Sequence, residues 1–251
     1  IRHKSRKGAA IARNTGITNS NCDYIAFLDD DDEWFPEKLG KQMAVMLAGQ
    51  PKVGLVYTGY YIVDRASDEI TGQMMPTKSG DLSEALLVGN CIGGASCVLV
   101  KKDCFKNVGM FDEALPPVED YDLWIRISRW FHFDYVKEPL LKYYVHQNKL
   151  STNLDARSRG LEILLLKHGN SPQFKRNLSY RYLSLGVAFC YSRDTGQALE
   201  SYLKAIKLYP FEFRHYFNLC LSLLGPEIFV KVKEAKANFP GILHKRSARS
   251  I

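Results

Sequence analysis

Hydrophobic positions in the first 150 residues fall into short apolar runs that alternate with stretches of helical spacing. The short runs predict strands over residues 24–28, 53–63, 97–100, 133–136 and 140–145. Apolar residues spaced three and four apart predict helices over residues 8–19, 36–48 and 82–88, and another that begins near residue 118. Strands that alternate with helices are typical of an α/β fold.

The most informative of these runs is Tyr24 to Leu28, which leads directly into five consecutive acids, Asp29 to Glu33. A run of this length is typical of a strand that is buried on both faces, as in a parallel sheet, and open α/β sheets bind ligands beyond the carboxyl ends of their strands. Two interpretations follow. The acids cap the helix that we expect from Pro36, or they hold a divalent metal, since hard oxygen ligands suit Mg²⁺ or Mn²⁺.

Residues 160–240 change in character and have helical spacing throughout. Eight of their positions match a tetratricopeptide repeat in residue type and spacing: Tyr182, Leu185, Gly186, Phe189, Ala198, Tyr202, Ala205 and Pro210. One repeat cannot bury its own apolar face, so we expect it to stack on helices over 156–168 and 213–224. Such a region either stabilises the rest of the chain or binds a protein partner.

The net charge is +7, from 34 basic and 27 acidic side chains. This excess favours a phosphate-bearing substrate, an anionic lipid surface or nucleic acid, and it does not choose among them. Much of it lies after Lys231, and we hypothesise that this basic end contacts an anionic membrane surface. No apolar run approaches the ~20 residues that a membrane span needs.

The six cysteines contain no C-x-x-C pair and no spacing typical of zinc ligands. Their neighbours are mostly apolar, so we expect buried free thiols in a reducing compartment. This points to the cytoplasm, at or near the inner face of the membrane if the basic end binds lipid.

Two further segments allow both a structural and a chemical interpretation. Arg13 is either an ordinary surface charge or a bidentate phosphate ligand. The glycine pair before Ser96 either forms a tight turn or lets the backbone approach a ligand closely.

The same ambiguity holds for the acids that open the helix near residue 118 and for a histidine after a strand. Glu119, Asp120 and Asp122 either complement the helix dipole or include a general base. His146 is either structural or a functional residue.

Five segments occur in one order over residues 8–151: ARNTGI, YIAFLDDDDEW, GGAS, EDYDLWIRI and YYVHQNKLS. Together they resemble the catalytic region of family 2 glycosyltransferases, which have the glycosyltransferase A-type fold. The resemblance implies a partial Rossmann-like mixed sheet in a catalytic domain over residues 1–153. We expect an all-helical, tetratricopeptide-like region over 156–240 and a basic tail over 241–251 to follow it.

The resemblance also implies the chemistry: an inverting transferase that moves a sugar from a nucleotide-diphospho-sugar to a hydroxyl of a glycan or lipid-linked acceptor, as in polysaccharide and cell-envelope synthesis. It implies Mn²⁺ or Mg²⁺ as the cofactor and no nucleic-acid partner. Asp31 matches the direct metal ligand, with Asp29 and His146 as further ligands. A metal there neutralises the charge that grows on the leaving diphosphate.

In the same family the E-D pair carries the catalytic base, which matches Asp120 beside Glu119. An acceptor hydroxyl is a weak nucleophile and needs such a base within hydrogen-bond reach. The resemblance places the following residues at the substrates: Arg13, Asn14, Asp29, Asp30, Gly94, Ser96 and Trp124.

One departure from the family concerns the start of the chain. Family members begin with a P-x-Y-N strand and a strand ending in D-D-x-S, which bind the base and ribose, and neither motif occurs here. We therefore expect an N-terminally truncated chain. Two alternatives remain: an inactive remnant whose helical region binds proteins, and a phosphatase of the haloacid-dehalogenase type. The phosphatase is disfavoured because Glu33 stands where that class needs Thr or Val.

Overall fold

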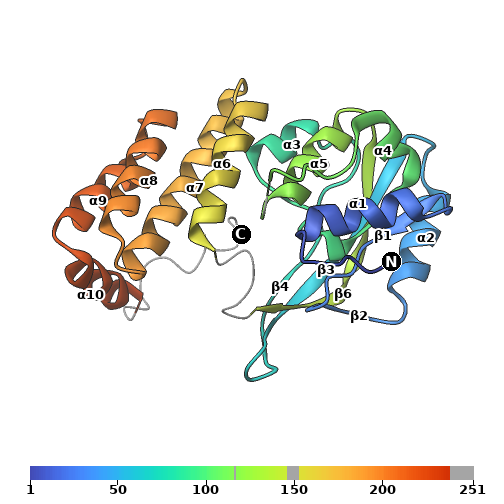
Figure 1. The fold of residues 1–251 in the computed structure, drawn as a ribbon, viewed down its shortest axis with the longest axis horizontal. Coiled ribbons are helices and arrows are strands. Elements are labelled where there is room, and N and C mark those ends of the chain that lie inside the picture. The colour runs from blue at the N-terminus through green and yellow to red at the C-terminus, as the bar shows by residue number, and fades with distance from the viewer. Residues whose placement is uncertain (116, 146–152, 238–251) are drawn as a thin grey trace. The chain divides into compact units, whose positions relative to one another are not determined.

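A computed structural model describes residues 1–115, 117–145 and 153–237. The chain divides into two compact units, Ile1–Thr152 and Asn153–Ile251, a division one residue from the boundary expected from the sequence. The first unit is a mixed α/β structure and the second is helical where it is described, which confirms the predicted fold class (Figure 1). The predicted basic tail lies outside the described residues.

The first unit is built around one six-stranded sheet with the order β1-β5-β3-β6-β2, to which β4 adds beside β3. Among the strands that the structure describes, only β3 and β6 pair in parallel, and the other neighbours are antiparallel. Its elements are α1 (Ala9–Asn19), β1 (Tyr24–Ala26), β2 (Glu33–Trp34), α2 (Lys38–Ala48), β3 (Val53–Asp64), β4 (Ile70–Met74), α3 (Ser83–Val88), the 3₁₀ turn η1 (Ala95–Cys97), β5 (Val98–Lys101), α4 (Lys102–Val108), α5 (Glu119–Ser128) and β6 (His132–Val145).

The strand before the acids differs from its prediction. β1 pairs with β5 alone among the described strands, in antiparallel register, and only its central Ile25 is buried. The apolar run looked longer because Phe27, just beyond the strand, is buried against the rings of Phe105 and Phe111. A short apolar run indicates that its side chains are buried, but it does not show which elements pack against them.

The two strands expected over 133–136 and 140–145 form one strand, β6. Its pairing with β3 shifts in register, so that Thr58 lies beside Val136 but Gly59 lies beside Pro139. Proline has no N–H to donate to a ladder, and here the Thr58 hydroxyl donates to the Glu138 carbonyl at 2.6 Å. The extra residues are therefore absorbed as a bulge, and β6 continues past them.

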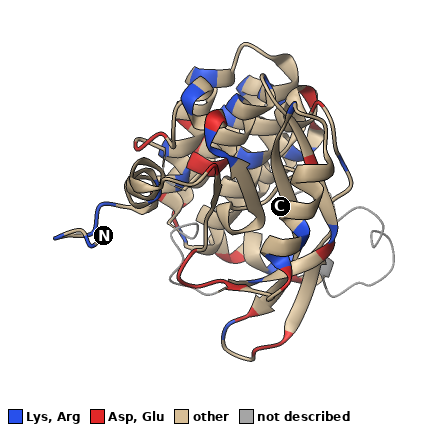
Figure 2. Ribbon diagram, turned by 90° about the vertical axis from the view of Figure 1, so that its right-hand side faces the viewer, with Lys and Arg blue, Asp and Glu red and all other residues tan. Residues whose placement is uncertain are grey.

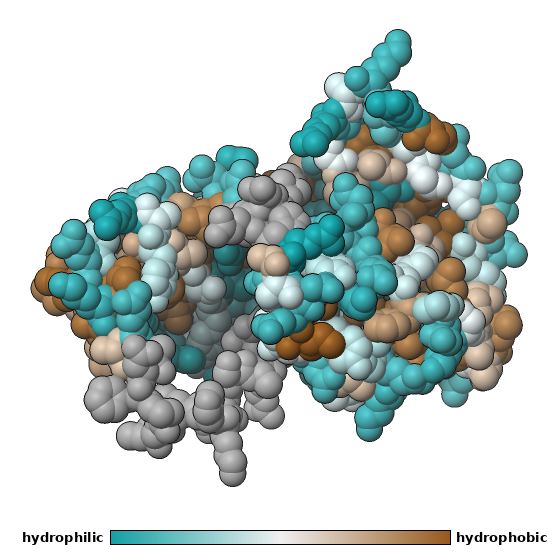
Figure 3. Space-filling view, turned by 90° about the horizontal axis from the view of Figure 1, so that it is seen from below, coloured by the Kyte–Doolittle hydropathy of each residue, from teal (hydrophilic) through white to brown (hydrophobic). Residues whose placement is uncertain are grey.

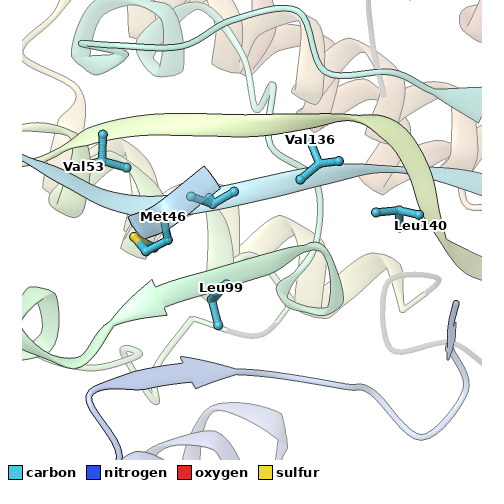
Figure 4. Close-up of a cluster of buried hydrophobic side chains, with 6 residues drawn as sticks. Met46, Val53, Leu99, Val136 and Leu140 are labelled. Carbon is cyan, nitrogen blue, oxygen red and sulfur yellow. The ribbon is translucent and has the colours of Figure 1, made fainter. Parts of the chain in front are cut away.

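A tight apolar cluster fixes α2 on the sheet. Met46 of α2 packs with Val53 and Val56 of β3, Leu99 of β5, and Val136 and Leu140 of β6 (Figure 4). Because these residues come from α2 and the three central strands, the cluster joins α2 to the sheet.

The second unit contains α6 (Leu154–His168), α7 (Pro172–Tyr191), α8 (Thr195–Leu208), α9 (Phe213–Leu223) and α10 (Pro226–Ala237). Four of these helices begin at a residue whose side chain accepts a backbone N–H of the first turn: Asn153, Ser171, Asp194 and Glu212. Each such cap contributes about 1 kcal/mol. The helix starts are therefore set locally by the sequence.

The residues of the predicted repeat pack α7 against α8. All of them except Pro210 are buried. Gly186 lets the two helices approach, since a Cβ there would lie 2.6 Å from Cε1 of Tyr202. This is the close packing that the pattern predicts, and assignment to the tetratricopeptide class stays a prediction.

Other expectations have mixed outcomes. All six cysteines are free, but Cys22 and Cys220 are exposed, so the expectation of uniformly buried thiols is wrong. No helix in the described ranges is long and apolar enough to cross a membrane. Red acidic and blue basic segments are interspersed in Figure 2, and a basic stretch before α1 extends away from the helix.

Candidate functional site

The acids after β1 form a tight turn that precedes its own short strand. The Asp32 amide donates to the Asp29 carbonyl, and β2 follows at once, paired with β6. The helix α2 begins only at Lys38, and none of the four aspartates caps it. The helix-cap interpretation of the acids is therefore wrong.

Three carboxylates of this turn converge. One oxygen from each of Asp29, Asp31 and Asp32 lies within 4.8 Å of the other two, and all three residues are half-buried. Three hard oxygen donors at this spacing suit a divalent cation such as Mg²⁺ or Mn²⁺. Asp32 is a candidate ligand that the sequence interpretation did not single out, because only the turn decides which acids of a run face one another.

Arg13 joins this turn to the E-D pair. Its Nη2 donates to Asp29 Oδ1 at 2.5 Å, and its Nη1 donates to Glu119 Oε1 at 2.7 Å. The Arg13 side chain is 12 % exposed and that of Glu119 is 6 % exposed. A guanidinium that is pinned between two carboxylates is not an ordinary surface charge, and the bridge brings residues 106 positions apart into one site.

The three acids at the start of α5 have different surroundings. Asp122 is fully buried and accepts from Nε of Arg126 at 2.8 Å, while Arg126 also donates to backbone carbonyls at the end of α4 and in the loop after it. That pair is structural. Glu119 is held by Arg13. Asp120 has no arginine bonded to it. All three acids lie in the first turn of α5, where they complement the helix dipole, and their different partners give them different further roles.

Asp120 is half-buried, and its ionised form is disfavoured. Burial, and then the negative charge of Glu119, raise the pKa of Asp120 to about 7, against the opposing effect of Arg13. Its Oδ1 accepts from the Tyr121 amide at 2.6 Å. A Cβ added to Gly94 would lie 3.8 Å from Asp120 Oδ2, so the glycine loop lies close to this carboxylate. A carboxylate with a pKa near neutrality is suited to general-base chemistry.

The loop before β5 is fixed to the acidic turn by Ser96. The Ser96 hydroxyl accepts from the Asp29 amide at 3.1 Å, and the Ser96 carbonyl accepts from Trp34 Nε1 at 2.9 Å. Ser96 and Trp124 are both buried, and Trp124 Nε1 donates to the Gly93 carbonyl at 3.1 Å. Side chains without an exposed surface cannot contact a substrate, so their geometry gives Ser96 and Trp124 positioning roles instead of the expected substrate contacts.

A buried lysine lies beneath the same loop. Lys38 is fully buried; its Nζ donates to Gln42 Oε1 at 2.8 Å and lies 4.1 Å from the centroid of the Trp34 ring. Gln42 in turn donates to the Cys97 carbonyl. Burial lowers the pKa of Lys38 to about 8. Lys38 therefore supports the indole that holds Ser96.

Tyr60 of β3 lies between the glycine loop and the charges of the two acidic groups. Burial raises the pKa of its phenol, and the charges of Asp120 and Asp32 both act in that direction. Its ring approaches Gly93, where a Cβ would lie 2.9 Å from Tyr60 Cε1. The sequence interpretation missed Tyr60 because one tyrosine in an apolar strand carries no signal of its own.

Asn14 and Asp30, two of the remaining expected site residues, do not take part in this network. Both polar atoms of the Asn14 amide bind the backbone of Phe111, at 2.9 and 3.0 Å, so Asn14 anchors the loop before α5. Asp30 is exposed and is not part of the carboxylate cluster. His146 lies outside the described residues.

Comparison with known proteins places this geometry in context. A model described as "Glycosyltransferase like family 2" matches residues 2–176. An uncharacterized glycosyltransferase of Haemophilus influenzae is 32 % identical over 158 residues, which cover 62 % of this chain and 53 % of that protein. The Escherichia coli enzyme WfgD, named a UDP-Glc:alpha-D-GlcNAc-diphosphoundecaprenol beta-1,3-glucosyltransferase, is 31 % identical over 149 residues, which cover 59 % of this chain and 55 % of WfgD.

Two more distant similarities cover more of the chain. The amylovoran biosynthesis glycosyltransferase AmsB of Erwinia amylovora is 27 % identical over 225 residues, or 86 % of this chain and 69 % of AmsB. A mannosyltransferase structure from Pyrobaculum calidifontis, in complex with GDP-Man and Mn²⁺, covers 95 % of this chain and 69 % of its own, at 17 % identity and a TM-score of 0.46.

The chain spans between about a quarter and about half of the length of several curated relatives that it matches, for example 27 % and 53 %. The family model, however, matches well over half of this chain. The chain therefore belongs to the glycosyltransferase-like family 2.

Proposed function

We propose that this protein transfers a sugar from a nucleotide-diphospho-sugar to a hydroxyl group, with inversion at the anomeric carbon and Asp120 as the base. The observation that carries the proposal is the bridge from Asp29 through Arg13 to Glu119, the residue next to Asp120. It joins a group of oxygen ligands to a carboxylate with a raised pKa in a single site. Such a pairing suits phosphate-directed metal binding beside proton abstraction.

The acidic turn fits a divalent cation. Asp29, Asp31 and Asp32 would hold it, and each offers an oxygen near the other two. When bound, Mn²⁺ or Mg²⁺ would supply a Lewis acid that neutralises the charge developing on a leaving diphosphate. Ser96 fixes the backbone of Asp29 and so orients one of these carboxylates.

Asp120 would take the proton of the acceptor hydroxyl. Its half-buried position disfavours the charged form, which makes the carboxylate a stronger base than an exposed aspartate. The facing Gly94 leaves room for an acceptor oxygen where a larger side chain would intrude. Inversion follows if the acceptor attacks from the side opposite to the diphosphate, in a single displacement.

The substrates are proposed by class. The printed names of WfgD and AmsB refer to a UDP-Glc donor with a diphosphoundecaprenol-linked acceptor and to amylovoran biosynthesis. We infer a nucleotide-diphospho-sugar donor for this chain, and a glycan or lipid-linked acceptor for polysaccharide synthesis. The alternative is an inactive member whose helical unit binds a protein.

An assay of nucleoside diphosphate release from a panel of nucleotide-sugars, with and without Mn²⁺, tests the activity. We expect Asp120→Asn to lower turnover by about 10²–10⁴-fold, the usual contribution of a general base, and Asp31→Asn to raise the Mn²⁺ concentration needed for half-maximal rate. Asp103→Asn, at an exposed acid of α4, serves as the matched control. Near-normal turnover in Asp120→Asn would refute the base assignment. Folded protein without metal-dependent release from any donor favours the inactive alternative.

A further inference from the structure

Helix α9 in the second unit has its polar face inside and its apolar face outside. Its buried residues are His215, Asn218, Leu221 and Ser222, three of which are polar. The residues 213, 217, 220 and 224, which are Phe, Phe, Cys and Leu, are exposed. They follow one another at intervals of four, three and four, so they form one narrow stripe along the helix. We call these four residues the α9 stripe.

The inward polar face is used for packing within the unit. His215 Nε2 lies 3.2 Å from the hydroxyl of Ser179, a buried residue of α7. Asn218 and Ser222 donate to carbonyls of α9 itself. Rotating the helix to bury the stripe would break the contact between His215 and Ser179 of α7, so that contact keeps the stripe on the outer face.

The exposed apolar area around the stripe is large for a single helix. Phe213 is 74 % exposed, Phe211 at its N-terminal end is 87 % exposed, and Leu223 and Leu224 are each more than 60 % exposed. Hydrophobic side chains gather at the left edge of Figure 3, where Figure 1 places α9 and α10. At roughly 200 Å² for a large side chain, the patch is on the order of 600 Å². This is at the upper end of the largest patch on a typical monomer, about 300–600 Å², and such patches are often functional.

We propose that the α9 stripe is a homodimer interface, in which α9 packs antiparallel against α9 of a second copy around a two-fold axis. An a/d-type seam accepts another helix. Antiparallel pairing about the helix centre sets Phe213 opposite Leu224 of the second copy and Phe217 opposite its Cys220. Each aromatic ring then meets a smaller side chain, which is the alternation that lets helices interdigitate.

Area and charge both favour a second copy over other occupants. Two such patches would bury on the order of 1,200 Å² in total, the lower limit for a specific interface. Lys207 lies in the last turn of α8, before α9, and Glu227 lies in the first turn of α10, after α9. Both are exposed and have no ion-pair partner in the described part of the chain. Antiparallel pairing brings Lys207 of each copy toward Glu227 of the other, so the flanking charges are complementary.

The test uses the full chain in sedimentation velocity across a concentration series. We expect a species of twice 28.6 kDa, and Phe217→Glu should raise the dimer dissociation constant by about 30-fold or more, the loss typical of a buried aromatic anchor. The control is Leu166→Glu, at an exposed leucine of α6, which should leave the dimer intact. Circular dichroism checks that both variants remain helical.

Cysteine crosslinking tests the antiparallel register. Two-fold pairing places the Cys220 residues of the two copies about 4.5 Å apart along the helix axis, within reach of a short bismaleimide. A Cys22→Ser chain should crosslink to dimer, and Cys220→Ser should not. Two sedimentation results would each overturn the proposal: a monomer at all concentrations, or a dimer that survives Phe217→Glu. A monomer that binds vesicles of phosphatidylglycerol and phosphatidylethanolamine, and loses this binding in Phe217→Glu, would overturn it as well.

Discussion

Asp120 should limit the stability of the first unit at neutral pH, and its replacement by asparagine should reveal this. In the folded state the pKa of Asp120 is raised from 3.8 to about 7, because the carboxylate is buried beside Glu119. A group with a raised folded pKa stabilises the fold when protonated. That stability is present below about pH 4, declines as the pH rises, and is lost above about pH 7. Asparagine carries no charge and does not titrate in this range.

The size of the effect follows from the pKa difference. At 1.36 kcal/mol for each pH unit, the interval from 3.8 to about 7 corresponds to roughly 4 kcal/mol. Water that reaches a half-buried carboxylate screens part of this, so we expect Asp120→Asn to gain about 2–3 kcal/mol at pH 8 over the wild type. For a unit of this size the gain corresponds to a rise of about 5–10 °C in melting temperature. At pH 4 the two proteins should unfold alike.

The chain offers a fluorescence probe for this measurement. Its three tryptophans, Trp34, Trp124 and Trp130, all lie in the first unit, so tryptophan emission follows the unfolding of that unit alone. Urea titrations at pH 4, 6 and 8 give the free energy of unfolding. Asp103→Asn, at an exposed acid, controls for loss of a negative charge. A stability difference that does not change with pH, or a variant that is less stable at pH 8, would refute the reasoning.

Three further changes test other contacts. Arg13→Met should lower the free energy of unfolding of the first unit by about 3 kcal/mol in urea titration, because buried Glu119 loses its partner. The double variant with Glu119→Gln should recover much of this loss, whereas additive losses would contradict the bridge. Ser96→Ala should raise the Mn²⁺ dissociation constant several-fold, measured by titration with electron paramagnetic resonance, because the Asp29 amide loses its acceptor. Unchanged Mn²⁺ binding would show that Ser96 does not position Asp29. Gly186→Ala should lower the free energy of unfolding of the second unit by about 1–3 kcal/mol, measured by helical circular dichroism, because the new Cβ meets the Tyr202 ring. Adding Tyr202→Leu should restore part of this loss, and no recovery would contradict a clash with that ring.

Local chemistry fixed many elements. Three helices of the second unit begin at the capping residues Asn153, Ser171 and Asp194, because each side chain accepts a hydrogen bond from the backbone N–H three residues later. The residues of the helical repeat pattern likewise anticipate the α7–α8 contact, since their spacing alone sets them on one face of each helix.

The sequence by itself determined that acids follow a strand, that an E-D pair opens a helix, and that a helical region comes last, because spacing and residue type carry these features. Only the tertiary structure decided which acids meet. A run of four aspartates looks uniform until a turn aims Asp29, Asp31 and Asp32 together and leaves Asp30 exposed. Neighbours far along the chain, which no local pattern specifies, likewise decide the role of Arg13, the burial that raises the pKa of Asp120, and the outward direction of the α9 stripe.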